Sequence, residues 1–427
     1  MQKVELLAPA GSMEKLKMAF LYGADACYLG GTTFGLRTNA KNFDLEEIAQ
    51  ACEYAHKWGK HIYVTVNIMA HNDDLFGLED YLTGLFKVNV DAILVSDPGI
   101  FMIVKETVPE MEVHLSTQAN ATNYKTLEFW KEQGMSRAVL ARELSLKEIS
   151  EIKERIAEPF ELEAFVHGAM CVSYSGRCLL SSFLTGRDAN RGECSHPCRW
   201  KYHLVESTRP DEYYPIVEDD HGTHILNSKD LCMIEHIPDL IRSGISSLKI
   251  EGRMKSAYYV ATVVRAYRLA IDAYYKNGDS WRFNPYWMEE IKKTSHRKFT
   301  TGFYYGNQYE EAQAYDTSKY IRDYSFIGVV IDENYEPGCW KIEQRNKFSV
   351  GEEVEIIEPG SNSTIYTKVL KIVEGATGQL REDAPHPQEK VIVKFEDLEA
   401  VELKMGSLMR KKLNSSQPVA VSLNPKP

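Results

Sequence analysis

The sequence predicts an α/β protein: a TIM-like (β/α)8 barrel with a cysteine-rich insertion, followed by a small all-β barrel. Through the first 280 residues, short apolar or β-branched runs alternate with longer amphipathic stretches, as in parallel strands joined by helices. The short runs number eight, which is the count that closes such a barrel. Beyond residue 325 the pattern changes to short alternating strands separated by turns.

The eight predicted barrel strands have the length and composition of buried strands. They are residues 4–7, 26–29, 61–66, 92–95, 113–115, 138–140, 162–166 and 247–250. Amphipathic stretches between the first seven predict helices at residues 13–22, 45–58, 75–86, 124–133 and 146–156, and Ser12 and Ser145 can cap two of them. A doubly wound open sheet is the main alternative. It is disfavoured because the first strand is followed by APAGS and not by G-x-G-x-x-G.

We divide the chain into four parts. Residues 1–280 form the predicted barrel domain, and its cysteine-rich insertion occupies residues 168–246. Residues 281–324 form a connecting strap that is rich in aromatic and basic side chains. A small β-barrel is predicted at residues 325–412, with strands at 328–330, 340–342, 353–357, 366–372 and 391–395, before a flexible tail at 413–427.

The composition is ordinary for a soluble globular protein. Lys and Arg number 50 against 61 Asp and Glu, which gives a net charge of −11. This balance disfavours binding to nucleic acid through a broad basic face, although a local basic groove stays open. No apolar run approaches the roughly 18 residues of a membrane span, and the first residues lack a signal-peptide core. We therefore expect a cytoplasmic protein without membrane contact.

Polar side chains follow the predicted strands at their carboxyl ends, where parallel barrels carry their active sites. They are Asn67, Asp97, Gln118, Asn120, Arg142, Glu143, His167, Glu251 and Arg253. Any one of them could equally cap a helix or form a salt bridge at the barrel mouth, and only their shared position favours a site. In the strap, His296 and Arg297 suit either a phosphate or stacked base, or a packed connection between domains.

Five of the eight cysteines lie in the insertion, in the pattern C-x6-C-x15-C-x3-C-x33-C. They are Cys171, Cys178, Cys194, Cys198 and Cys232. No pair has C-x2-C spacing, so zinc ribbons and thioredoxin-type sites fit poorly. Four thiolates from separated loops suit an iron–sulfur cluster, while zinc and five unligated cysteines remain alternatives. Neither H-E-x-x-H nor G-x-S-x-G occurs, so the sequence provides no recognisable hydrolase motif.

Six multi-residue segments, spread along the chain, match one known pattern. They read ELLAPAG at 5–11, EAFVHGAMC at 163–171, SGRCLLS at 175–181, NRGEC at 190–194, SKDLC at 228–232 and KIEGR at 249–253. These segments resemble the collagenase-like peptidase family of unknown catalytic type. The resemblance extends to about residue 410 and includes a C-terminal barrel similar to those of translation factors. It is strongest to the branch that hydroxylates the wobble uridine of tRNA to 5-hydroxyuridine.

This resemblance implies oxygen-independent tRNA modification by an iron–sulfur protein. It implies a 4Fe-4S cluster with four thiolate ligands, prephenate as co-substrate, tRNA as partner and room for a partner subunit of the same family. The ligands it implies are Cys171, Cys178, Cys194 and Cys232, and we expect Cys198 to lie beside the cluster without binding it. The family name comes from proteolysis, so a peptidase is one alternative function. A non-catalytic RNA or protein adaptor is another.

Roles for the polar residues follow as hypotheses. Inserting oxygen into a pyrimidine without O2 needs redox chemistry that side chains lack. Arg142 and Arg253 are predicted to clamp the carboxylates of prephenate, each with two parallel hydrogen bonds. Further substrate contacts are assigned to Gln118, Lys249, His296 and Arg297, and the general acid or base to Glu143, Glu163, His167 or Glu251. A local basic path for tRNA phosphates comprises Arg187, Arg191, Arg199, Lys201, Arg297 and Lys298, which could instead form internal salt bridges.

Overall fold

The computed structural model describes residues 3–36, 42–171, 173–199, 217–219, 222–224, 229–306, 320–336, 338–398 and 400–413. The chain divides into two compact units, Met1–Tyr320 and Ile321–Pro427. No helix in these described ranges is both long and apolar enough to cross a membrane.

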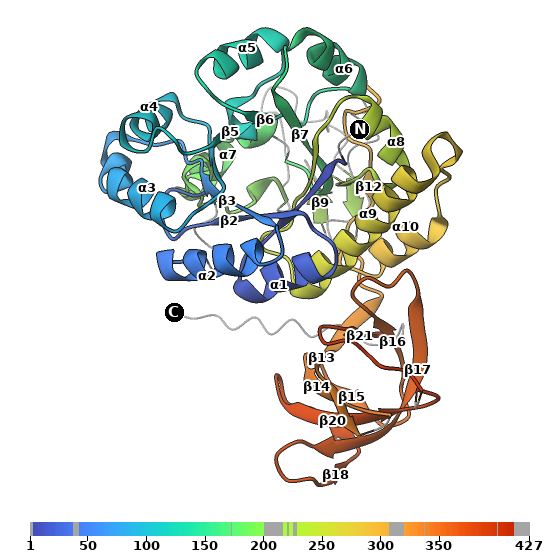
Figure 1. Cartoon of the computed structure of the whole chain (residues 1–427). Coiled ribbons are helices and arrows are strands. Elements are labelled where there is room, and N and C mark those ends of the chain that lie inside the picture. The colour runs from blue at the N-terminus through green and yellow to red at the C-terminus, as the bar shows by residue number, and fades with distance from the viewer. Residues whose placement is uncertain are drawn as a thin grey trace. The chain divides into compact units, whose positions relative to one another are not determined.

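The first unit contains a closed parallel barrel, which confirms the predicted fold class. Its strands are β1 (Glu5–Pro9), β2 (Ala26–Gly30), β3 (His61–Val66), β4 (Ala92–Val95), β5 (Val113–Leu115), β6 (Arg137–Val139), β7 (Glu161–Ala169) and β11 (Ser247–Ile250). Neighbours pair in parallel in this order, and β11 pairs with both β7 and β1, so that no edge is left open. The open-sheet alternative is therefore wrong. Figure 1 shows the strands surrounded by helices.

Several helices of the first unit begin with a side-chain cap, including the two caps that the sequence indicates. They are α1 (Met13–Leu21), α2 (Leu45–His56), α3 (Leu78–Lys87), α4 (Pro98–Thr107), α5 (Tyr124–Glu132), α6 (Leu146–Arg155), α8 (Ile237–Arg242), α9 (Ala257–Asn277) and α10 (Pro285–Lys292). Ser12 accepts a hydrogen bond from the backbone N–H of Lys15, and Ser145 accepts one from that of Glu148. Asp97, one of the polar residues at the strand ends, caps α4 in the same way.

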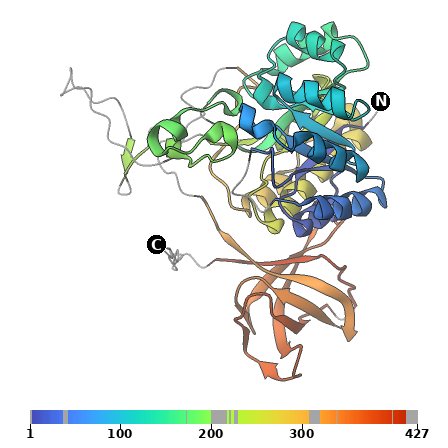
Figure 2. The ribbon, with the colours of Figure 1, turned by 90° about the vertical axis from the view of Figure 1, so that its left-hand side faces the viewer.

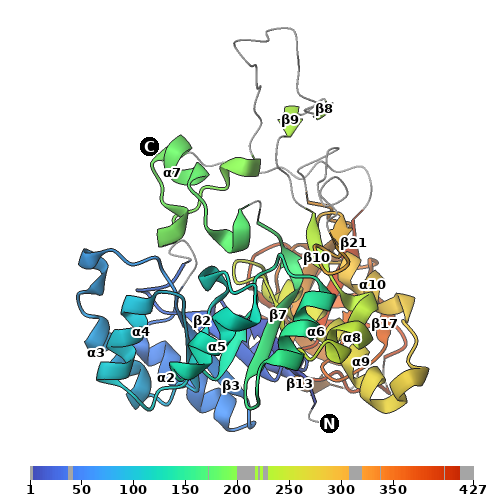
Figure 3. The ribbon, with the colours of Figure 1, turned by 90° about the horizontal axis from the view of Figure 1, so that it is seen from above.

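The segment after β7 departs from the simple alternation of strands and helices. It contains α7 (Leu180–Thr185), three short 3-10 turns, η3 (Tyr174–Gly176), η4 (Ala189–Arg191) and η5 (Pro197–Arg199), and a two-stranded hairpin of β8 (Val217–Asp219) and β9 (Gly222–His224). The chain then returns as β10 (Asp230–Cys232), which pairs antiparallel with β7 and parallel with β12 (Phe299–Thr300). A further 3-10 turn, η6 (Ile234–His236), leads from β10 to α8. In Figures 2 and 3, α7 lies on the opposite side of the barrel from the N-terminus, where the strands end.

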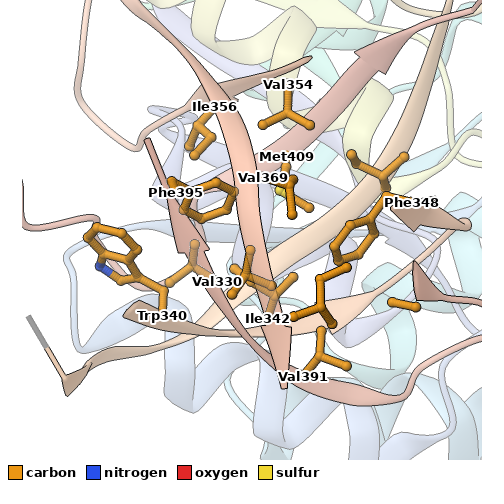
Figure 4. Close-up of a cluster of buried hydrophobic side chains, with 14 of the residues drawn as sticks. Val330, Trp340, Ile342, Phe348, Val354, Ile356, Val369, Val391, Phe395 and Met409 are labelled. Atoms are coloured by element: carbon orange, nitrogen blue, oxygen red, sulfur yellow. The ribbon is translucent and has the colours of Figure 1, made fainter. Parts of the chain in front are cut away.

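The second unit is a closed antiparallel barrel of six strands. They are β13 (Tyr324–Glu336), β14 (Cys339–Gln344), β16 (Glu353–Ile357), β17 (Thr364–Glu374), β20 (Lys390–Phe395) and β21 (Leu408–Lys412), with short β15 (Phe348–Ser349), β18 (Leu380–Arg381) and β19 (Asp383–Ala384) beside them. Pairing of β16 with both β17 and β21 closes the barrel. Figure 4 shows its apolar core, which includes Trp340, Phe348 and Phe395.

Candidate active site at the barrel mouth

The loop that follows β7 is fastened to the end of β6. The Glu143 carboxylate accepts hydrogen bonds from the backbone N–H and the hydroxyl of Ser175, both at 2.6 Å. Ser175 has a φ of 43°, in the left-handed region that non-glycine residues rarely adopt. The Glu143 contacts therefore hold a turn that is locally unfavourable. Glu143, a predicted acid or base, serves in this arrangement to anchor the loop between Cys171 and Cys178.

Arg142 presents one unused edge of its guanidinium group. Its Cζ lies 4.0 Å from the centroid of the Phe165 ring, and its Nη1 donates to the carbonyl oxygen of Ala169 at 3.2 Å. Its Nε is buried and bonds to none of the residues that the structure describes, and the same residues offer no partner to Nη2. The Nε–Nη2 edge is the one that binds a carboxylate with two parallel hydrogen bonds. The Nε is closed to solvent, so a carboxylate could reach this edge only after a local rearrangement, and the Arg142 clamp stays a prediction.

Arg253 differs from Arg142 because its guanidinium is already engaged. Nη1 donates to Thr65 Oγ1 at 3.2 Å, and Nη2 donates to Asn42 Oδ1 at 2.7 Å. The group lies so close to Gly30 that any side chain there would overlap it. Arg253 is only 5% exposed. It joins the ends of β2, β3 and β11, and its assignment as a substrate clamp remains a prediction.

Two amide side chains at the mouth share a polar network. Asn67 follows β3, whereas Ser116 and Gln118 follow β5, the latter within the 3-10 turn η2 (Thr117–Ala119). Asn67 Nδ2 donates to Ser116 Oγ at 3.1 Å and to Gln118 Oε1 at 3.0 Å, and the Ser116 hydroxyl donates to the same Gln118 oxygen at 2.5 Å. Arg177 Nε donates to the Gln118 carbonyl at 2.7 Å. This network therefore joins the cysteine loop to the mouth.

Glu163 and Lys249 lie inside the barrel and form an ion pair there. Lys249 Nζ is 2.5 Å from Glu163 Oε1, and Arg137 Nη1 is 3.3 Å from Glu163 Oε2. Burial alone would raise the pKa of Glu163, but the nearby Lys249 and Arg137 outweigh it and hold this pKa below its usual value. Arg137 also pairs with Glu5 at 2.6 Å. Glu163, predicted as an acid or base, and Lys249, predicted as a substrate contact, therefore both take part in a buried ionic network. Their predicted roles stay predictions.

His167 and Glu251 end neighbouring strands but lie in different environments. The His167 ring is 2% exposed and packs against Tyr259, Tyr267 and Phe299. Burial lowers the pKa of His167 to about 3, so the imidazole is neutral at pH 7. Glu251 is half-buried, and its backbone N–H donates to the His167 carbonyl at 2.8 Å. Glu143 and Glu251 are both half-buried at the mouth, but both carboxylate oxygens of Glu143 accept hydrogen bonds from Ser175.

The two strap residues predicted to bind substrate are packed inside the first unit. Arg297 Nη1 lies 3.2 Å from Asp230 Oδ1, and its backbone N–H donates to the other oxygen of the same carboxylate. His296 stacks on Phe299 with ring centroids 4.7 Å apart. Both residues are at most 6% exposed. These contacts favour the packed connection over the phosphate site.

The predicted basic path is only partly described. Arg191 forms an ion pair with Asp74, whereas Arg187 and Lys298 are exposed. The side chain of Arg199 and all of Lys201 lie outside the described residues. A continuous path for phosphates therefore stays a prediction.

The cysteines of the insertion provide the donors of a thiolate site without forming a closed one. Cys171 is exposed, Cys178, Cys194 and Cys198 are half-buried, and Cys232 is buried. Asn190 holds Cys178 at two points, accepting from its N–H at 3.0 Å and donating to its carbonyl at 3.1 Å. In the described ranges, no three Cys, His, Asp or Glu side chains converge as metal ligands. By donor chemistry the segment fits an iron–sulfur cluster, although its described side chains are not gathered around one point.

Comparison with known proteins identifies the family. Residues 11–314 match Peptidase family U32, and residues 322–410 match the Peptidase family U32 C-terminal domain. The chain is 45% identical over 394 residues to tRNA hydroxylation protein P1 of Bacillus subtilis, with 92% of each chain covered. It is 37% identical over 425 residues to tRNA hydroxylation protein P of Escherichia coli, covering 90% of this chain and 92% of that one. An uncharacterized protease of Methanocaldococcus jannaschii is 39% identical over 385 residues, covering 88% of this chain and 91% of that one. The chain belongs to peptidase family U32.

Proposed function

We propose that this protein hydroxylates the wobble uridine of tRNA to 5-hydroxyuridine, using an iron–sulfur cluster and prephenate as co-substrate. The observation that carries the proposal is the 45% identity to a tRNA hydroxylation protein over 92% of both chains. Identity over that length includes both units of the structure, and 37% identity to a second such protein extends over 90% of this chain.

Four cysteines would hold the cluster, namely Cys171, Cys178, Cys194 and Cys232. Such a cluster supplies the electron transfer that side chains cannot. The protein itself contributes the positions of the loops: Glu143 holds the turn before Cys178, and Asn190 holds the backbone of Cys178. The loop after β7 lies at the barrel mouth because Glu143 and Gln118, which hold it, both follow barrel strands.

Arg142 is the residue that we assign to a carboxylate of prephenate. Its Nε and Nη2 have no partner among the described residues, and its Cζ lies 4.0 Å from the centroid of the Phe165 ring. Two parallel hydrogen bonds from Nε and Nη2 to a carboxylate would require the buried Nε to open to the ligand. Glu251 is the candidate acid or base because it ends β11 with a partly exposed carboxylate. A peptidase is less well supported, because the sequence contains neither H-E-x-x-H nor G-x-S-x-G and so provides no recognisable hydrolase motif.

The cluster is tested by anaerobic purification, with assays of iron and acid-labile sulfide. We expect about four irons and about four sulfides per chain, with a broad absorbance near about 400 nm. A colourless protein that holds one zinc, or no metal, would remove the cluster from the proposal.

The carboxylate clamp is tested by substituting Arg142. Arg142→Lys keeps the positive charge but loses the planar fork, so prephenate affinity measured by calorimetry should fall by about tenfold or more. Arg155→Lys is the matched control, because Arg155 is the last residue of α6 and its guanidinium likewise lies over an aromatic ring, that of Tyr124. Equal prephenate affinity in the wild type and Arg142→Lys would rule out the clamp.

A further inference from the structure

We infer that Asn67 and Gln118 recognise the hydrogen-bonding edge of a pyrimidine base at the barrel mouth. The inference rests on the proposed function and specifies which groups select the base. It starts from two amides that hold each other in place and leave one donor and one acceptor unused.

The orientation of both amides is fixed by their mutual contacts. Gln118 Oε1 accepts from Asn67 Nδ2 at 3.0 Å and from the Ser116 hydroxyl at 2.5 Å, which turns Gln118 Nε2 away from the network. Asn67 Nδ2 is likewise occupied by Gln118 and Ser116, which turns Asn67 Oδ1 away. Exchanging oxygen and nitrogen in both amides would preserve the bonds and again leave one donor and one acceptor. The surplus pair is therefore independent of how the amides are assigned.

The unused acceptor is buried. Asn67 is 7% exposed, and its Oδ1 has no hydrogen-bond partner within the described residues. Native proteins rarely leave a buried polar atom unpaired, and an exception is often explained by a ligand or an ordered water. Gln118 is only partly buried, and no described residue accepts a hydrogen bond from its Nε2.

The surroundings suit a planar, polar ligand. A Cβ built at Gly176 would lie 3.9 Å from Gln118 Nε2, in van der Waals contact, so the loop between Cys171 and Cys178 passes beside this amide. Arg142, at the end of the next strand β6, places a positive charge there, and its buried Nε has no partner within the described residues. Arg177 fastens the same loop to the Gln118 carbonyl. A donor, an acceptor and a cation thus lie around the ends of β3, β5 and β6.

Uracil carries the complementary groups. Its N3–H donates and its C4 carbonyl accepts, and these are neighbours on one edge of the ring. Asn and Gln amides read base edges through such donor–acceptor pairs, and RNA-binding proteins read unstacked bases on this edge. Asn67 Oδ1 would accept from N3–H, and Gln118 Nε2 would donate to the carbonyl. A base carrying a methyl group on N3 cannot make the first of these bonds.

The test compares two synthetic anticodon stem-loops that differ only by N3-methylation of the target uridine. Fluorescence anisotropy measures the affinity of the full-length protein for each RNA. We expect the wild type to bind the methylated RNA about tenfold more weakly. In Asn67→Ala and in Gln118→Met this penalty should shrink to within about twofold, because Asn67 Oδ1 accepts from N3–H and Gln118 holds the Asn67 amide in position. Gln50→Ala, on the exposed face of the outer helix α2, is the control and should keep the full penalty.

Each outcome bears on the inference. Equal binding of the two RNAs by the wild type would overturn it. A penalty that persists in both variants would also overturn the inference. It would indicate that the unused amide groups bind an ordered water and not the base. Thermal unfolding of each variant shows whether it is folded, and either variant suffices. If the wild type binds neither RNA, the proposed function itself fails, which is a different result from binding without discrimination.

Discussion

Glu143 and Ser175 form a two-point contact between the end of β6 and the loop that joins Cys171 to Cys178. One carboxylate oxygen of Glu143 accepts a hydrogen bond from the backbone N–H of Ser175, and the other accepts one from the Ser175 hydroxyl, each at 2.6 Å. Hydrogen bonds to an ionised acceptor are stronger than neutral ones. This contact makes Glu143 a positioning residue for the cysteine loop.

Glu143→Gln should loosen that loop. Gln can accept from the Ser175 N–H and donate to the Ser175 hydroxyl, but both hydrogen bonds then lack the carboxylate charge and are weaker. Amide hydrogen exchange in residues 174–178, followed by mass spectrometry, should accelerate by about tenfold.

The control for this prediction is a similar contact on the barrel exterior. Glu148 accepts from the backbone N–H of Ser145 at 2.8 Å and from its hydroxyl at 2.6 Å, at the start of α6. Glu148→Gln should affect exchange in the first turn of α6 and leave residues 174–178 unchanged. Unchanged exchange of these residues in Glu143→Gln would contradict the positioning role.

The buried pair of Glu163 and Lys249 should matter for stability. Glu163→Gln leaves the Lys249 ammonium inside the barrel without its carboxylate, and breaking such a buried pair costs about 3–5 kcal/mol of unfolding free energy. Urea unfolding of both proteins measures this loss. Glu53→Gln breaks an exposed ion pair with Lys57 on α2 and should leave the midpoint unchanged. Similar midpoints for wild type and Glu163→Gln would show that the pair contributes little.

His61 should give the barrel a pH-dependent contribution to stability. A hydrogen bond from His61 Nδ1 to Asp91 Oδ1, at 3.1 Å, raises the pKa of His61 above its ordinary value. The stabilisation is therefore complete below the unfolded pKa of about 6.5 and is lost as pH rises through the raised folded pKa. The free energy of unfolding should fall less steeply over this range in His61→Gln than in the wild type. Parallel curves, or a His61 pKa at or below about 6.5 by NMR, would contradict this prediction.

The barrel could be predicted from local sequence because its signals are local. Each barrel strand is a short apolar run, and the observed strands begin and end within a few residues of the predicted ones. β21 was missed because Arg410 and Lys411 read as surface residues. Arg410 is in fact fully buried, and its guanidinium pairs with Glu355 of β16 at 2.7 Å. That pairing depends on a strand 55 residues away.

The site was less predictable than the fold because the contacts of its side chains depend on residues far away in the sequence. Arg142 and Arg253 look equivalent in sequence, since each follows a strand. They differ in their partners, because the Arg253 guanidinium donates to Thr65 in β3 and to Asn42 in the loop before α2. Glu163 and Lys249 did carry a usable signal: a charged residue inside a buried strand requires a partner of opposite charge. The positions of the cysteines around a cluster stay a prediction.

The proposed activity of this chain is the hydroxylation of uridine in tRNA. The most direct measurement is nucleoside analysis by mass spectrometry of tRNA from a bacterial strain that lacks its own tRNA hydroxylation proteins and expresses this chain. We predict that 5-hydroxyuridine reappears with the wild type, and that it is lost in Cys171→Ser and when prephenate synthesis is blocked. Soluble, folded wild-type protein without any 5-hydroxyuridine in the tRNA would contradict the claim.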